Sequence, residues 1–285
     1  MTRLVLGTAQ FGSAYGVTNA LGRLADADVA ALVAAARAGG IDTFDTAADY
    51  GDSQDRLGAL APAGNRYVTK FSFPAEGAID ADALFARSAA TLGVDRLAGV
   101  MFHKLADLRD PRAAGAIDVL WAARAEGRIE RAGVSVYDAS DLELALAVFP
   151  DLDLVQLPAN LVDTRLLDNP LVSRLRETGA EIHARSAFLQ GILLAAPGAL
   201  PAGFEPFEPV VVELDRRAEE AGTTRLALAL GFLRDSGVVD GVVVGATTTA
   251  ELTGILAGWN SPSAVSRAEL PPVPAELLDP RSWPR

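Results

Sequence analysis

Short apolar runs alternate with longer helical patterns along the whole chain, and this alternation constrains the fold more than any other feature. Alanine- and leucine-rich patterns with helical spacing lie, for example, over residues 26–38, 82–92, 113–125 and 140–148. The apolar runs have the composition of buried strands and cover residues 4–7, 41–45, 66–70, 98–102, 131–135, 153–157, 180–185 and 240–244. Eight such alternations in 285 residues predict an α/β fold with one domain, a (β/α)8 TIM barrel.

Two segments depart from simple alternation. Between the seventh and eighth runs the chain is long enough for two helices, over about 209–221 and 224–235. Residues 260–285 contain six prolines, so we expect an irregular tail that lies on the barrel. No linker or internal repeat divides the sequence, and the predicted domain therefore spans residues 1–285.

Composition narrows the possible partners. The formal net charge of −12 argues against a nucleic acid or an anionic membrane surface. The chain has no cysteine and only two distant histidines, so we expect no disulfide, no thiolate chemistry and no metal site. There is no apolar signal segment, no apolar stretch that could span a membrane and no extension for a protein partner. These features favour a cytoplasmic protein that acts on a small molecule.

Rare ionisable residues end three successive strand candidates. Asp45, Lys70 and His103 hold these positions, and Lys70 and Lys104 are the only lysines among 25 basic residues. In a barrel the carboxyl ends of all strands meet at one mouth, where catalytic residues gather. Tyr50 lies on the loop that follows Asp45 and can reach the same mouth.

The four side chains suit proton donation to a carbonyl. A free phenol has a pKa near ~10, and we expect the ammonium of Lys70 to lower the pKa of Tyr50, with Asp45 orienting the lysine. A histidine beside the phenol can hydrogen-bond the substrate's carbonyl oxygen. The quartet has no nucleophile or electron source of its own, so a polarised carbonyl needs a hydride from a cofactor.

Several motifs resemble those of the aldo-keto reductase superfamily, in the family's order. They are Gly7-Thr-Ala-Gln-Phe-Gly12, the segment 40–58 around Phe44-Asp-Thr-Ala-Ala-Asp-Tyr-Gly51, Val68-Thr-Lys70, Gly133-Val-Ser135 and Val155-Gln156. The resemblance implies a barrel that binds NADPH, or less often NADH, without a Rossmann fold. It also implies a catalytic tetrad of Asp45, Tyr50, Lys70 and His103, with Ser135 and Gln156 holding the nicotinamide.

The resemblance extends to the other cofactor positions, with departures. Val136 replaces an asparagine of the family, and Arg185 stands where an aromatic residue stacks on the nicotinamide. The two positions that clamp the 2′-phosphate of NADPH fall on Gly245 and Glu251, and residues 235–266 contain no lysine or arginine. The implied cofactor-binding set is Ser135, Gln156, Arg185, Ser186, Phe188, Gly245, Thr247, Thr248 and Glu251. We therefore expect NAD(P)H as the cofactor, with NADH accepted at least as well as NADPH, unless Arg267 or Arg281 folds back onto this site.

For the substrate, the family's pocket-forming segments indicate a polar carbonyl compound such as a sugar. The candidate pocket residues are Tyr15, Asn19, Phe71, Phe102, Lys104 and Trp283 with Arg281.

Other interpretations stay open at this stage. Lys70 suits a Schiff-base lyase or aldolase, although a neighbouring carboxylate keeps an amine protonated. A regulatory barrel could bind the cofactor and turn over slowly. Asp45 and Lys70 are also consistent with a structural ion pair. His183 is typical of an interior histidine with satisfied hydrogen bonds.

Overall fold

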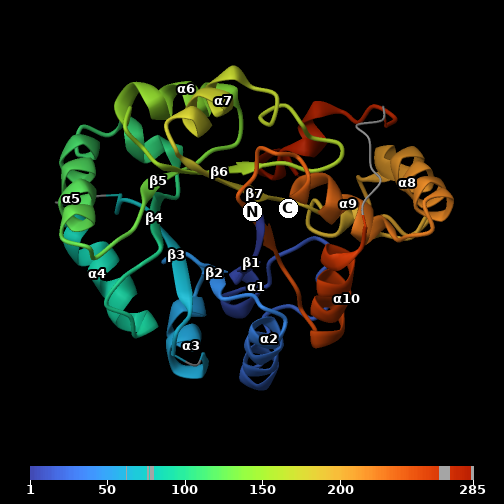
Figure 1. Ribbon diagram of the computed structural model, residues 1–285, viewed down its shortest axis with the longest axis horizontal. Coiled ribbons are helices and arrows are strands. Elements are labelled where there is room, and N and C mark those ends of the chain that lie inside the picture. The colour runs from blue at the N-terminus through green and yellow to red at the C-terminus, as the bar shows by residue number, and fades with distance from the viewer. Residues whose placement is uncertain (62, 76, 78–79, 263–269, 284–285) are drawn as a thin grey trace.

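Eight parallel strands close into a barrel in sequence order (Figure 1). The structure is a computed structural model that describes residues 1–61, 63–75, 77, 80–262 and 270–283. The strands are β1(Arg3–Gly7), β2(Thr43–Asp45), β3(Arg66–Phe71), β4(Gly99–Phe102), β5(Ala132–Ser135), β6(Leu154–Pro158), β7(Glu181–Arg185) and β8(Gly241–Val244). Pairing of β1 with β8 closes the barrel. The predicted single-domain (β/α)8 fold is confirmed, and each strand lies within two residues of its predicted bounds.

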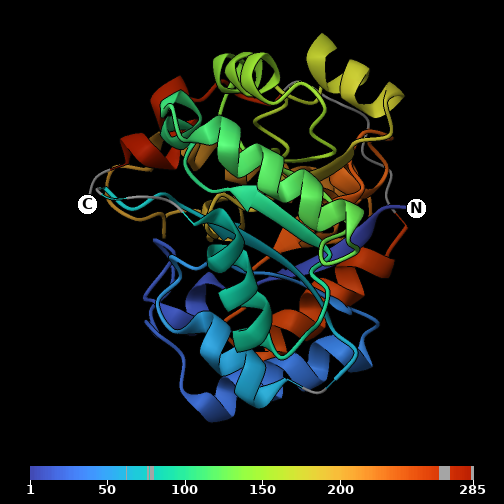
Figure 2. The same ribbon diagram turned by 90° about the vertical axis from the view of Figure 1, so that its left-hand side faces the viewer.

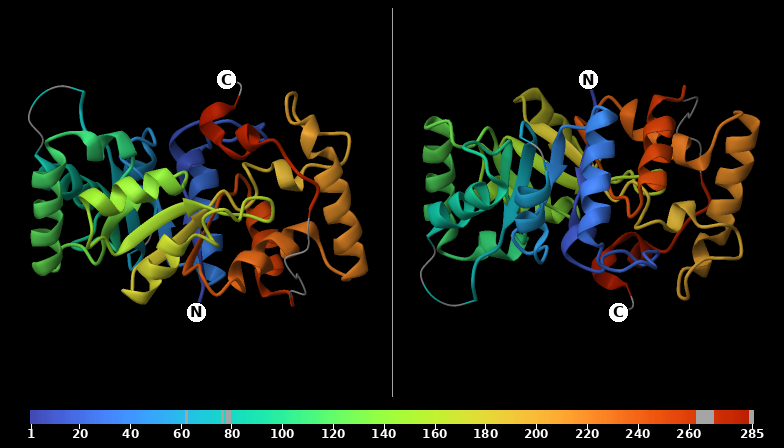
Figure 3. Two further views of the ribbon diagram at one scale, coloured as in Figure 1. Left: turned by 90° about the horizontal axis from the view of Figure 1, so that it is seen from above. Right: turned by 90° about the horizontal axis from the view of Figure 1, so that it is seen from below.

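Helices surround the strands (Figures 1 and 3). The longer ones are α2(Asp26–Ala38), α3(Ser53–Leu60), α4(Ala81–Leu92), α5(Ala113–Ala125), α6(Ala139–Val148), α7(Pro170–Glu177), α8(Glu208–Glu220), α9(Arg225–Arg234) and α10(Thr249–Asn260). A short helix, α1(Ala9–Gly12), follows β1. The two helices expected between β7 and β8 are α8 and α9. Within the part of the chain that the structure describes, none of the helices is long and apolar enough to cross a membrane.

Sequence signals fix several helix ends. Asp80, Asp138 and Thr224 precede α4, α6 and α9, and each side chain accepts a hydrogen bond from a backbone N–H of the first turn. Gly93 ends α4 in the left-handed conformation, with φ of 68°.

Apolar side chains fill the barrel interior, and charged side chains lie beneath them. Val68, Met101 and Leu154 form a small apolar cluster at its centre. Below them, at the amino ends of the strands, His183 and Arg3 contact Glu181. Because this interior is filled, the ionisable residues at the opposite strand ends face the mouth of the barrel.

The described part of the tail lies at the mouth. It contains the 3-10 turns η4(Ala275–Leu278) and η5(Pro280–Ser282). Figures 2 and 3 place this red segment on the side of the barrel opposite Met1. Arg281 on η5 contacts Asp138, which follows β5, and the tail is thereby joined to the strand ends.

Candidate active site

A buried lysine–aspartate pair forms the floor of the site. Lys70 Nζ donates to Asp45 Oδ1 at 2.5 Å and to the Thr46 carbonyl oxygen at 3.1 Å. Gln156 Nε2 donates to Asp45 Oδ2 at 2.8 Å, so both carboxylate oxygens have a partner. The Lys70 side chain is only 1% exposed, and burial lowers the pKa of its ammonium, although the charge of Asp45 works in the opposite direction.

Tyr50 lies directly above this pair. Its Oη is 3.4 Å from Lys70 Nζ. Two glycines allow the loops after β1 and β2 to approach closely enough for this position. A Cβ on Gly12 would lie 1.8 Å from the Tyr50 carbonyl oxygen, and Gly51, with φ of +58°, packs against the Gly12 backbone.

The expected lowering of the Tyr50 pKa is wrong for this structure. Burial raises the pKa of the phenol above its ordinary value, and the charge of Asp45 adds to the rise, while Arg185 opposes it. The sequence places Lys70 near Tyr50 but does not reveal how far the phenol is removed from water. Tyr50 is therefore a neutral phenol that carries its proton at neutral pH.

His103 borders Tyr50 on the other side. The two rings meet edge to face, with centroids 5.5 Å apart. Burial lowers the pKa of His103 to about 4, and the positive charge of Lys70 contributes, so the imidazole is neutral at pH 7. Its Nδ1 lies 3.3 Å from Asp49 Oδ2, which also accepts from Ser72 Oγ at 2.6 Å. Lys104 Nζ is 3.9 Å from the same carboxylate oxygen.

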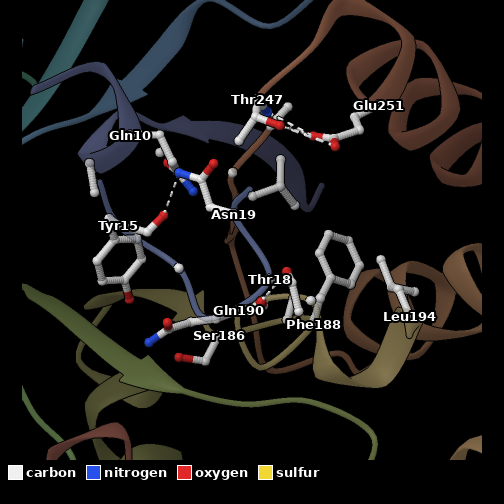
Figure 4. A pocket seen from close by; sticks show the side chains of 18 of the residues that line it. Gln10, Tyr15, Thr18, Asn19, Ser186, Phe188, Gln190, Leu194, Thr247 and Glu251 are labelled. Carbon is white, nitrogen blue, oxygen red and sulfur yellow. Dashed lines mark hydrogen bonds between the residues drawn. The ribbon is translucent and has the colours of Figure 1, made fainter. Parts of the chain in front are cut away.

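A cavity of about 680 Å³ starts at Asp45 and Tyr50 and extends between the loop after β7 and the start of α10. Figure 4 shows side chains from these segments pointing into it. The predicted site residues on its wall are Asp45, Tyr50, Tyr15, Asn19, Gln156, Arg185, Ser186, Phe188, Gly245, Thr247 and Glu251. Residues far apart in the sequence are thus brought together as the strand-end pattern predicts.

Other predicted pocket residues are not on this cavity. Phe71 and Phe102 are buried in the hydrophobic core with ring centroids 4.8 Å apart, because Phe71 follows the inward-facing Lys70 and points to the opposite side of the strand. Trp283 packs edge to face against Phe204 at 4.8 Å and donates from Nε1 to the Leu277 carbonyl. The Lys104 side chain is 62% exposed, and its Nζ lies 3.9 Å from Asp49 Oδ2.

Two predicted cofactor residues are not part of the cavity wall. Ser135 ends β5, is buried, and pairs in register with Gln156. Thr248 caps α10 and accepts a hydrogen bond from the Glu251 N–H. Neither lines the cavity itself.

The loop after β7 has an unusual backbone. Ser186, Leu189 and Gln190 have φ values of 62°, 46° and 52°, a region that costs a residue other than glycine about 1–2 kcal/mol. This turn directs Ser186, Phe188 and Gln190 toward the cavity (Figure 4). Thr18 Oγ1 donates to the Gln190 carbonyl at 2.7 Å, so the loop after β1 bridges to the loop after β7.

Glu251 occupies the amino end of α10. Its carboxylate accepts from Thr247 N at 2.7 Å and from Thr247 Oγ1 at 3.0 Å (Figure 4). Of the described residues that line the cavity, Arg185 alone carries a positive charge. Arg281 does not fold back onto α10, because it pairs with Asp138 and Asp279 at the other side of the mouth. Arg267 lies outside the described residues.

Sequence reasoning did not identify several residues of the site. Asp49, Gln10 and Tyr137 are the main ones. Asp49 lies within the quoted motif, and Gln10 lies within Gly7–Gly12, where it contacts Gly245 closely. Tyr137 contacts the Arg185 guanidinium at 4.0 Å, a pairing that no spacing in the sequence indicates.

His183 is an interior residue, as expected, and its Nε2 lies 2.9 Å from Glu181 Oε1. Among the described residues, its Nδ1 finds no hydrogen-bond partner. No cluster of potential metal ligands occurs among the residues that the structure describes.

The fold and these strand-end residues define the class of protein, which is a barrel enzyme with its reactive side chains at the carboxyl ends of the strands. The sequence profile of the Aldo/keto reductase family matches residues 3–264, and the chain belongs to this family. It is an oxidoreductase of the aldo-keto reductase type, as the sequence motifs predict.

Solved structures share the fold. A glycerol dehydrogenase from Gluconobacter oxydans is 22% identical, with a TM-score of 0.71, over 92% of this chain and 87% of that chain. An aldo-keto reductase from Bacillus halodurans in its holo form is 18% identical, with a TM-score of 0.70, over 96% and 89%. At these identities the likeness shows the fold alone. A search of the curated proteins returned no match.

Proposed function

We propose that this protein transfers a hydride between a nicotinamide dinucleotide and the carbonyl or alcohol of a small polar substrate, with Tyr50 as general acid and base. One observation carries the proposal. The Tyr50 hydroxyl lies 3.4 Å from a buried ammonium and on the wall of a cavity that leads away to the amino end of α10. A cavity with a proton donor on its wall can hold the reacting carbonyl group at that donor, beside a cofactor that is bound in an extended form.

The residues on the cavity fit a dinucleotide. The cavity volume of about 680 Å³ lies within the ~300–1,000 Å³ range of ligand pockets. Gly245 lets the Gln10 side chain pack closely against the strand end on this wall, since a Cβ there would lie 2.6 Å from Gln10 Nε2. The N–H groups at the start of α10 suit a phosphate or a ribose. When bound, the cofactor supplies or accepts the hydride.

The proton comes from Tyr50. In the reductive direction the phenol donates its proton to the substrate oxygen as negative charge develops there. The ammonium of Lys70 then stabilises the phenolate that remains. Asp45 holds Lys70 in place, and Gln156 holds Asp45, so the cation is fixed before the reaction begins.

For cofactor choice we propose that NADH is accepted at least as well as NADPH. A 2′-phosphate normally needs charge-assisted contacts from arginine or lysine. Near the start of α10 the cavity offers the threonine hydroxyl of Thr247 and the carboxylate of Glu251, which repels a phosphate. A ribose 2′-hydroxyl, in contrast, can donate to that carboxylate.

For the substrate we propose a polar, hydroxylated carbonyl compound. The Tyr15 hydroxyl, Gln10 and Arg185 are polar groups on the cavity wall. Asn19 is occupied, because its amide bonds the Tyr15 and Gly22 carbonyls and the Leu21 and Gly22 N–H groups. The structural neighbour named as a glycerol dehydrogenase acts on a polyol, which agrees with this choice.

The other candidate functions have less support. A Schiff-base lysine must become a free amine, whereas Lys70 donates to three oxygen atoms and is absent from the cavity wall. A regulatory barrel would bind the dinucleotide and leave carbonyl compounds almost unchanged.

The test compares Tyr50→Phe with Tyr67→Phe. Both changes remove one phenol oxygen, but Tyr67 lies on the outer side of β3, where its hydroxyl contacts Asn65. Tyr50→Phe is expected to lower the rate of cofactor oxidation with aldehydes by ~10²-fold or more, with nearly normal cofactor binding. Tyr67→Phe is expected to stay near the wild type. Equal rates in the two variants would reject Tyr50 as the acid, and binding without turnover in the wild type would favour the regulatory barrel.

A further inference from the structure

Arg185, a cation on the cavity wall, forms no ion pair within the part of the chain that the structure describes. Arg185 ends β7 beside β6, the strand that carries Gln156, and Gln156 in turn contacts Asp45. It therefore lies at the carboxyl ends of the strands, on the same cavity as Asp45 and Tyr50. Among the residues that the structure describes, none places a carboxylate oxygen within ion-pair distance of Arg185; its polar contacts are with the Val136 carbonyl at 3.0 Å and Ser186 Oγ at 3.3 Å.

A neighbouring arginine, Arg281, differs from Arg185 in its ion-pair partners. Arg281 and Arg185 both stack on the Tyr137 ring, with guanidinium carbons 4.2 and 4.0 Å from its centroid. Arg281 is neutralised by Asp138, Asp141 and Asp279. Among the described residues, the outer arginine, Arg281, thus pairs with three carboxylates, whereas the inner one, Arg185, forms an ion pair with none.

The inner guanidinium is also held in a fixed orientation. The Tyr137 ring supports one face, and the Val136 carbonyl and Ser186 hydroxyl engage part of its donors. The remaining N–H donors are available to the cavity. A partly buried arginine without a counter-ion is costly unless a ligand supplies the anion, and its planar fork matches a carboxylate in a bidentate way.

We infer that Arg185 binds an anionic oxygen group of the substrate, and that the natural substrate is a carboxylate-bearing carbonyl compound, an oxo acid or a sugar acid. This inference rests on the proposed function, because it places the carbonyl of the same molecule at Tyr50. Tyr15 lies on the same cavity, and an ordinary phenol with a pKa near ~10 is protonated at neutral pH, so its hydroxyl is available as a donor to a carboxylate.

The cofactor's pyrophosphate is the other possible source of the anion. The structure favours the substrate, because a separate segment of the cavity wall, the start of α10 after β8, offers the helix N-terminus that suits phosphates. The experiment separates the two sources by comparing a substrate effect with a cofactor effect.

The test uses D-glucuronate and D-glucose, which differ in a carboxylate against a hydroxymethyl group. For the wild type, kcat/KM is expected to be at least tenfold higher for glucuronate, and Arg185→Gln should reduce this ratio about tenfold or more, mainly through KM. Arg185→Lys keeps the charge and should retain part of the ratio. Arg128→Gln is the matched control, since Arg128 also stacks on an aromatic ring, Phe85, but outside the cavity.

Three results would overturn the inference. The first is no preference for glucuronate in the wild type, and the second is a glucuronate-to-glucose ratio of kcat/KM that is unchanged in Arg185→Gln. The third is an equal loss of kcat/KM with both sugars that follows a loss of NADH affinity. The last result would assign the anion to the cofactor. If neither sugar is turned over, thermal unfolding decides. If glucuronate but not glucose raises the unfolding temperature, and Arg185→Gln abolishes this effect, the anion site is supported although the proposed reaction fails. Equal effects of the two sugars would reject the site.

Discussion

His103 Nδ1 lies 3.3 Å from Asp49 Oδ2, and this contact determines which ring nitrogen carries the proton. Burial alone would raise the pKa of Asp49, but the hydrogen bond from Ser72 and the proximity of His103 and Lys104 lower it, so the carboxylate is ionised and can only accept. A neutral imidazole must therefore hold its proton on Nδ1. Nε2 is then an acceptor, which suits a hydrogen bond from a substrate hydroxyl rather than donation to a carbonyl.

The first prediction concerns the pH dependence of turnover. An ordinary histidine titrates near ~6.5. His103 is buried beside Lys70, with Asp49 and Asp45 opposing, and its pKa is about 4. It stays neutral above that value, so kcat/KM for carbonyl reduction should show no histidine titration between about pH 5.5 and 7.5. An inflection in that range that disappears in His103→Gln would contradict the assignment.

The second prediction tests Asp49 as a positioning residue. Asp49→Asn keeps the shape but lets Nδ1 be either donor or acceptor, so His103 loses its fixed tautomer. We expect turnover to fall by about tenfold, while the dissociation constant of the cofactor changes little. Asp55→Asn, a change in the exposed first turn of α3, serves as the control. A loss of cofactor affinity as large as the loss of turnover would show a general structural role instead.

The third prediction concerns stability. Lys70→Met leaves the Asp45 carboxylate buried without its cation, and such an uncompensated charge typically costs about 3–5 kcal/mol. The double variant Asp45→Asn, Lys70→Met should be more stable than Lys70→Met alone, because no charge remains to be buried. Urea unfolding of the four proteins in this cycle measures the difference. Additive effects of the two changes would show that the pair is not coupled.

The base of the barrel yields the fourth prediction. Burial alone would raise the pKa of Glu181, but the hydrogen bond to His183 and the charges of Arg3 and Arg131 lower it from 4.5 to about 2. A lowered carboxylate pKa adds stability that is present above about pH 4.5 and is lost as the pH falls toward 2. Glu181→Gln should remove this pH dependence, on the order of 2–3 kcal/mol. Glu213→Gln, at an exposed ion pair on α8, should change little.

The periodicity of the sequence determines where the strands lie, whereas packing determines which side chains face the cavity. The strands and the site at their carboxyl ends were predictable, because eight apolar runs of strand length that alternate with helices match the number of units that a (β/α)8 barrel requires. The exclusion of Phe71 from the cavity was not, because strand parity turns it away from the side on which Lys70 lies. Trp283 was misplaced for another reason, since the tail has no periodicity that would orient a side chain.

Electrostatic properties were the least accessible from sequence. The position of Tyr50 followed from its motif, yet its pKa depends on burial that only the folded chain defines. The stack of Arg185, Tyr137 and Arg281 joins residues from β7, the loop after β5 and the tail, and nothing in their spacing indicates contact.

The last prediction concerns cofactor choice at the start of α10. Glu251 bonds Thr247 N and Oγ1, so its carboxylate fills the place where a 2′-phosphate would need cations. Glu251→Arg replaces a repelling charge with a charge-assisted donor and should tighten NADPH binding at least tenfold relative to NADH, ~1.4 kcal/mol. Glu251→Gln removes the charge alone and should produce a smaller shift in the same direction. Dissociation constants of both cofactors, measured by fluorescence titration, give the ratio. NADPH binding more than about tenfold tighter than NADH in the wild type would mean that another cation reaches this site, and that Glu251 does not set the preference.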